Sequence, residues 1–353
     1  MRRRDVLLAG STGIGLSLAG CTLGLSDPEP EVSADPSPPW SQDGRVYHPA
    51  HRVGMKLIDT AEHGDRTVAL SYSYAERFWT VTGTRTQRVG IDDEYNAVHM
   101  MVSAWDTGTQ TVLPVGSGLR LRVERVKNGE VVTERAPWPM LSQKMGFHFG
   151  DNIYFPGQET FRVAVEVGAT TIGRRGAFQG EFENSGTVTF EFDFRRGIRN
   201  EIGIQKFFDR RGSSGASQPM EMSMLPLSVA PPSEALPGRR LGEATSGDAV
   251  FPITATDSAD GTYLAVCPRT PYNRYVLPLM SLSARIDRGG TTVFDGPLPA
   301  AVGPERGYHY GTTVDSVESG DELVVTVDSP PQVARHEGYE SAFLEMSAVS
   351  VTV

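Results

Sequence analysis

The sequence predicts an all-β protein made of two antiparallel β-sandwich domains related by internal duplication. Two observations lead to this prediction: apolar and polar residues alternate with a period of two along short segments, and one set of motifs occurs twice. Such alternation is typical of strands with one buried face, and short strands at this spacing favour sandwiches. The clearest segments are residues 67–74, 119–126, 160–167, 187–194 and 322–327.

The internal repeat predicts the domain organisation. Residues 96–106 align with residues 260–270, and at the same offset residues 112–115 align with residues 276–279. Units repeated in a fixed order indicate duplication of a domain. We therefore expect an export signal at 1–21, an acidic Pro-rich tether at 22–48, a first sandwich with additional N-terminal strands at 49–196, a linker containing Met and Pro at 197–245, and a second sandwich at 246–353.

The first 21 residues have the pattern of an export signal. A basic start precedes a weakly apolar run rich in Gly, Ser and Ala, which is the order of a signal peptide. Arg3 and Arg4 resemble the twin-arginine export signal, and Leu-Ala-Gly-Cys, ending at Cys21, resembles a lipobox. The run is too short to span a bilayer, which takes roughly 20 apolar residues. We expect an extracytoplasmic protein attached to the outer face of the cell membrane by lipid on Cys21.

Composition and motifs exclude several classes of function. The net charge of −10 and the lack of a basic stripe argue against nucleic-acid binding. Only four of the 33 basic residues are lysines, which is typical of a salt-adapted, haloarchaeal source. Beyond Cys21 only Cys267 remains, so we expect a core thiol and no intrachain disulfide. No nucleophile elbow, zinc-protease helix motif or phosphate loop occurs, and we expect no catalysis.

Both copies contain a turn in which a histidine lies between two aromatic residues and two glycines. The turns are Gly146–Gly150 and Gly307–Gly311, so His148 aligns with His309. A histidine in such a turn commonly hydrogen-bonds backbone carbonyl groups and fixes the loop. Metal ligation is the alternative, and the motif alone leaves both interpretations open.

The repeat resembles the periplasmic iron-permease-associated metal-binding proteins, a family of small immunoglobulin-like sandwiches that bind copper or a similar metal and assist iron uptake. The resemblance covers about residues 96–194 and 249–349. Its marks are the strand that begins near His99, a Pro-Met pair ending at Met140, and the turn that contains His148. It implies that both sandwiches are immunoglobulin-like.

The same resemblance implies a metal site of three histidines and one methionine. The matching residues are His99, Met140 and His148 in the first copy, and His309 and His336 in the second, weaker one. Arg175 stands at the fourth position of the first copy, and Tyr263 stands at the first position of the second. A thioether with imidazoles favours Cu(I), whereas imidazoles alone also suit Zn(II) or Cu(II).

Two functions follow as expectations. The leading one is a cell-surface lipoprotein that binds a transition metal, copper or iron, and assists iron or copper uptake with an iron permease as partner. The alternative is a metal-free adhesion or structural module whose metal sites have decayed, which the incomplete ligand sets favour. Met220, Met222 and Met224 lie at period two and offer three thioethers to Cu(I), although ordinary packing is the favoured interpretation.

Overall fold

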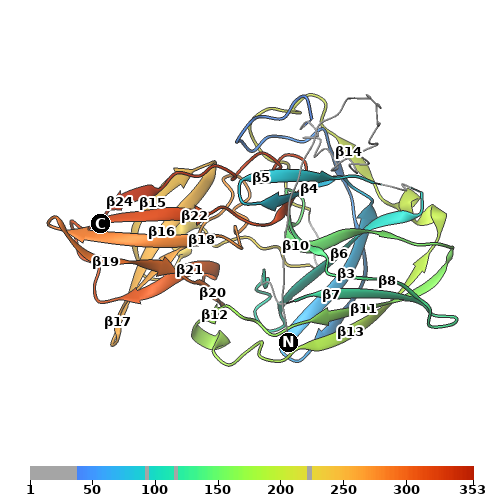
Figure 1. The fold of residues 1–353 in the computed structure, drawn as a ribbon, viewed down its shortest axis with the longest axis horizontal. Helices are drawn as coiled ribbons and strands as arrows, with labels where there is room; N and C mark the ends of the chain where they lie inside the picture. Colours follow the sequence, from blue (N-terminus) through green and yellow to red (C-terminus); the bar gives the residue numbers. More distant parts are fainter. Residues whose placement is uncertain (1–37, 92–94, 115–117, 221–224) are drawn as a thin grey trace, which may run out of the picture. The chain divides into compact units, whose positions relative to one another are not determined.

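The computed structural model describes residues 38–91, 95–114, 118–220 and 225–353, all within one compact unit. Arg3, Arg4, Cys21, Met222 and Met224 lie outside the described residues. The described part is almost entirely β-sheet, packed as sandwiches, which confirms the predicted all-β sandwich architecture (Figure 1). Its helices are short 3-10 turns at Gly176–Phe178, Arg196–Glu201 and Ser233–Ala235, and none of the described helices has the length and apolarity needed to cross a bilayer.

Two sheets form the first sandwich. The larger has the order β2-β3-β6-β10-β9-β23-β4-β5, and the smaller has the order β13-β11-β7-β8. The strands of the larger sheet are β2 (Lys56–His63), β3 (Arg66–Tyr74), β4 (Phe78–Thr82), β5 (Arg85–Val89), β6 (Ala97–Asp106), β9 (Trp138–Ser142), β10 (Gly146–Tyr154) and β23 (Ala334–Arg335). Those of the smaller are β7 (Arg120–Arg125), β8 (Val131–Arg135), β11 (Glu159–Val167) and β13 (Gly186–Phe194).

The core of this sandwich explains the period-two pattern. Along β13 every second side chain is buried and the side chains between them are exposed, except at the strand's first residue, which is half-buried. The buried Phe192 packs against Tyr72 of β3, with ring centroids 5.3 Å apart, and against Phe155 at 5.2 Å. Burial of such aromatic rings contributes most of the apolar area that holds two sheets face to face.

The second sandwich contains a six-stranded and a four-stranded sheet, with the orders β12-β20-β21-β17-β16-β15 and β19-β18-β22-β24. The six-stranded sheet contains β12 (Gly173–Arg174), β15 (Arg239–Ser246), β16 (Ala249–Ser258), β17 (Gly261–Val266), β20 (Ala300–Gly303) and β21 (Gly307–Val314). The other contains β18 (Ser281–Arg288), β19 (Thr291–Leu298), β22 (Glu322–Ser329) and β24 (Val349–Thr352). A separate pair joins β1 (His51–Val53) to β14 (Ile204–Lys206). Cys267 is a buried free thiol, as predicted.

Two very short strands cross between the sandwiches, and they determine which residues of the two sandwiches come together. β12 follows the first sandwich's β11 in sequence, yet it pairs in parallel with β20 of the second. β23 follows β22 of the second sandwich, yet it pairs in parallel with β9 of the first. The N–H of Arg175 donates to the carbonyl of Val302 at 2.9 Å, and that of His336 donates to the carbonyl of Leu141 at 3.2 Å. Each sandwich therefore receives the residue that the repeat assigns to the other.

Candidate metal centre

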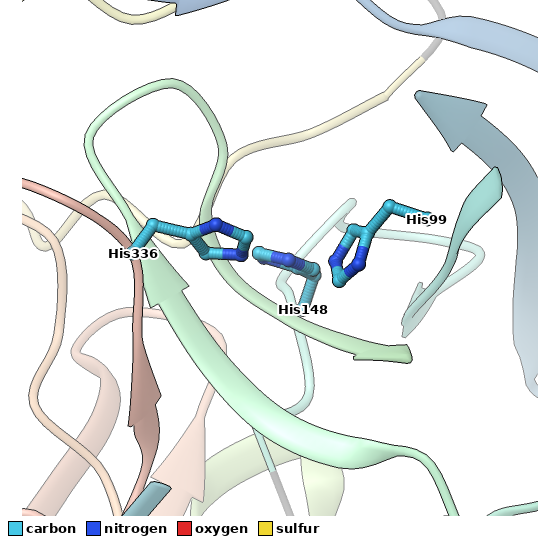
Figure 2. Close-up of side chains that lie close together, drawn as sticks. All are labelled: His99, His148 and His336. Carbon is cyan, nitrogen blue, oxygen red and sulfur yellow. The ribbon is translucent and has the colours of Figure 1, made fainter. Parts of the chain in front are cut away.

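Three buried histidines from separate segments meet on the larger sheet of the first sandwich. His99 lies on β6, His148 lies on the neighbouring β10, and His336 directly follows β23. On β6 the alternate residues Val98 and Met100 face the main core, so His99 faces the opposite side of the sheet. Figure 2 shows the three imidazole rings close together.

The separations fit a shared ligand after small adjustments. Each histidine offers one ring nitrogen, and the three nitrogens lie within 4.8 Å of one another. Atoms at these separations lie within about 2.8 Å of a common point, whereas metal–nitrogen bonds measure about 2.0–2.1 Å. Small ring rotations would close this difference.

Hydrogen bonding prepares the rings for ligation. Nδ1 of His99 lies 3.0 Å from Oδ1 of Asn152, and Nδ1 of His148 lies 3.2 Å from the carbonyl oxygen of Gly146. Because both partners can only accept, the proton is on Nδ1 and the lone pair is on Nε2. Nε2 of His99, His148 and His336 is buried without a hydrogen-bond partner. Metal-binding histidines in proteins typically have this arrangement, in which the second nitrogen is held by an oxygen.

Glu76 supplies the corresponding oxygen for His336. Its Oε2 lies 3.2 Å from Nδ1 of His336, a distance suited to electrostatic attraction, although the angle does not make a hydrogen bond. Its Oε1 lies 2.5 Å from Nζ of the buried Lys144. Burial alone would raise the pKa of Glu76, but Lys144 and His336 outweigh it and hold the pKa well below the usual range. The centre is thus bordered by a buried ion pair.

Burial also keeps the imidazoles of His99 and His148 neutral. It lowers the pKa of His99 to about 3, with a further contribution from His336, and it holds the pKa of His148 well below its ordinary value. Since only a neutral imidazole offers a lone pair, these two residues are ready to bind a cation at neutral pH.

Met140 borders the same space. A Cβ atom placed on Gly150 would lie 2.7 Å from Nε2 of His99 and 3.0 Å from Sδ of Met140, so the glycine leaves room for both atoms. His148 pairs with Met140 across β10 and β9. Phe78 covers the cluster, with its ring centroid 6.0 Å from that of His99. The structure therefore groups His99, Met140 and His148, as the resemblance implied, and adds His336 to them.

The second predicted pair is not brought together. His336 is in the first sandwich, and His309 instead places Nε2 3.0 Å from the hydroxyl of Tyr263 and Nδ1 3.0 Å from the carbonyl oxygen of Gly307. The guanidinium of Arg175 lies 4.0 Å from the centroid of the Tyr263 ring. The hydrogen bonds of His309 are thus complete without a metal, and the His99, His148 and His336 cluster is the single such group found in the described part of the chain.

Comparison with known proteins adds little at this level of similarity. A family model described as a domain of unknown function (DUF7350) matches residues 234–352, about the extent of the second sandwich. The comparison with curated proteins gave no match. Two solved structures of FetP from uropathogenic Escherichia coli strain F11, one as isolated and one a copper-bound Glu-to-Gln variant, are 14% identical to this chain, with a TM-score of 0.28. The matches cover 40% of this chain and 95% and 97% of FetP. Such values carry no functional argument, which has to come from the site itself.

Proposed function

We propose that this protein binds a transition metal ion at His99, His148 and His336, with the thioether of Met140 beside them. The supporting observation is that three buried imidazoles each place a ring nitrogen within 4.8 Å of the other two, and that Nε2 of each of them has no hydrogen-bond partner. An unsatisfied buried polar atom costs about 1–3 kcal/mol, so three together favour a ligand that satisfies all of them. A single cation does so.

The donor set favours copper. Imidazole and thioether are borderline and soft ligands, which suit Cu(I), whereas a carboxylate ligand would favour harder ions. Glu76 contacts the outer nitrogen of His336 and is therefore a group that orients a ligand. Zn(II), Cu(II) and Fe(II) are the competitors to include in a titration.

We further propose that the metal serves uptake at the cell surface. The N-terminal pattern ending at Cys21 supports export and lipid attachment, which would hold the metal centre outside the membrane beside a permease. The protein would then pass on or sense the metal without catalysing a reaction. A copper or iron permease is the partner class that this role requires.

Anaerobic titration of the purified protein with Cu(I), against a competing chelator, tests the proposal. We expect one-to-one binding that the variants His148→Ala and His336→Ala lose. His309→Ala is the matched control, because His309 occupies the matching position on β21 of the second sandwich, and it should bind as the wild type does. Equal loss in all three variants, or no binding of any of the four ions, would contradict the proposal.

The alternative of a metal-free structural module is supported by the second sandwich alone. There Tyr263, His309 and Arg175 satisfy one another in the place where a metal would lie. If the folded protein binds no ion, the first sandwich has the same structural role, and this alternative replaces the proposal.

A further inference from the structure

A cavity of about 760 Å³ adjoins the metal centre. His336, Glu76 and Lys144 form part of its wall, so it reaches the side of the centre on which Glu76 contacts His336. Its size lies within the range of small-molecule binding sites, roughly 300–1,000 Å³. A molecule bound in it would lie beside the proposed metal ligands.

The wall of the cavity is basic, although the chain as a whole has a net charge of −10. Its basic residues are Arg52, Arg77, Arg88, Lys144 and Arg199, and its acidic residues are Glu76 and Glu337. A basic cavity attracts anions and raises their local concentration, even though the net negative charge of the whole protein repels them.

Two of these arginines carry charges that no carboxylate offsets. Arg52 donates to the carbonyl oxygen of Gln218 at 2.6 Å and to Oε1 of Gln205 at 2.8 Å, both of which are neutral. Arg77 is exposed and forms no ion pair with another described residue. Glu76, by contrast, is already paired with Lys144. A guanidinium group that has no carboxylate partner within the protein can bind the carboxylate of a ligand, whose two oxygens match its planar geometry.

The remaining wall is apolar and aromatic, which favours an organic anion over an inorganic one. It includes Trp40, Tyr74, Trp79 and Ile204. The indole nitrogen of Trp79 is buried and has no hydrogen-bond acceptor. Aromatic side chains with a polar donor commonly bind ligands that have an apolar body and polar ends.

We propose that this cavity binds a small organic polycarboxylate with an apolar or aromatic body, and that Arg52 and Arg77 bind its carboxylates. The inference rests on the cavity and its charges, and it holds whether or not a metal occupies the neighbouring centre. If the metal does bind, the same anion would lie next to His336.

Calorimetric titration of the metal-free, full-length protein with benzene-1,3,5-tricarboxylate tests the proposal. We expect saturable one-to-one binding that weakens as salt is added, because exposed charges are screened. Arg77→Gln should weaken binding roughly tenfold, the usual effect of losing one charge-assisted hydrogen bond. The matched control is Arg85→Gln, which removes an exposed arginine outside the cavity wall and should leave binding within about twofold of the wild type.

Three results would overturn the inference: no binding, equal weakening by Arg77→Gln and Arg85→Gln, or equal affinity for inorganic phosphate. Absence of binding would show that the cavity is not an anion site. Equal weakening would show that the anion is attracted only by the general charge of the surface, and equal affinity for phosphate would show that the cavity does not select an organic ligand. The His148→Ala variant separates this inference from the metal proposal. It should lose Cu(I) binding and keep tricarboxylate binding, so either proposal can fail without the other.

Discussion

The buried carboxylate of Glu76 links the segment between β3 and β4 to the metal centre, and Glu76→Gln removes its charge while keeping its size. The side chain of Lys144 is 6% exposed and that of Glu76 is 17% exposed, so water screens their ion pair weakly. Removing one partner of a buried pair leaves an uncompensated charge, which costs about 3–5 kcal/mol. Because Gln still offers an oxygen to the ammonium group, we expect a loss near the lower limit, about 3 kcal/mol.

A second substitution isolates the cause of that loss. In the double variant Glu76→Gln, Lys144→Met no ammonium group is left unpaired, and replacing a whole buried pair is often nearly neutral. We expect the double variant to lose about 1 kcal/mol, less than the single variant Glu76→Gln. Urea unfolding of the metal-free protein, followed by tryptophan fluorescence, measures both values.

The same variants test whether Glu76 orients His336. Substitution of a group that orients a metal ligand typically lowers metal affinity 10–100-fold, and we expect a loss in this range for Cu(I) with Glu76→Gln. A Glu76→Gln protein as stable as the wild type, or a double variant less stable than the single one, would refute the account of the buried pair. Unchanged Cu(I) affinity would refute the orienting role.

Three further predictions concern other residues. Stability should fall as the pH decreases from 6.5 toward 4, by about 1.4 kcal/mol per pH unit for each histidine whose pKa is lowered in the folded protein, because the unfolded chain binds protons there and the folded chain does not. The histidines with lowered pKa in the sandwiches are His99, His148 and His309. Urea midpoints measured at pH 7, 6 and 5 that coincide would contradict this. Gly150→Ala should abolish Cu(I) binding, since the added Cβ would lie 2.7 Å from Nε2 of His99. The control Gly197→Ala should bind Cu(I) as the wild type does, because its Cβ would meet open space. Equal Cu(I) titrations of the two variants would show that the space at Gly150 is not needed. Arg175→Gln should lower the free energy of unfolding by about 1 kcal/mol, because the contact of Arg175 with the Tyr263 ring is lost, and it should leave Cu(I) binding intact. Reduced Cu(I) binding would count against separate roles for the three-histidine cluster and the cluster of Tyr263, His309 and Arg175.

The sheet pattern and part of the site were predictable because they depend on local sequence. Alternation of the kind seen in residues 187–194 is the direct result of burying one face of a strand, and β13 shows it in the structure. His99, Met140 and His148 were grouped by the family resemblance, and they lie on three strands, β6, β9 and β10, that are neighbours in one sheet.

The third histidine of the cluster, His336, was not predictable in this way. The sequence assigned His336 to the second copy, but it follows a two-residue strand that pairs with β9 of the first sandwich. A strand of two residues has no periodicity and fixes no register, so nothing local indicates which sheet it joins. Glu76 was missed for a related reason: carboxylates between strands are usually solvated, and only the fold places Lys144 next to this one.

The position of His336 depends on its neighbour Arg335, which is fully buried. Burial lowers the pKa of this guanidinium to about 9. The guanidinium donates to the carbonyl oxygens of Pro331, Tyr339 and Ala342, and it lies 5.5 Å from the ring centroid of Phe343. These contacts fold the segment after β22 around one side chain and hold β23 against β9. Since His336 directly follows Arg335 within that segment, a cation that binds the docked position of β23 more tightly than the undocked one would stabilise the contact between the two sandwiches by that difference in binding free energy.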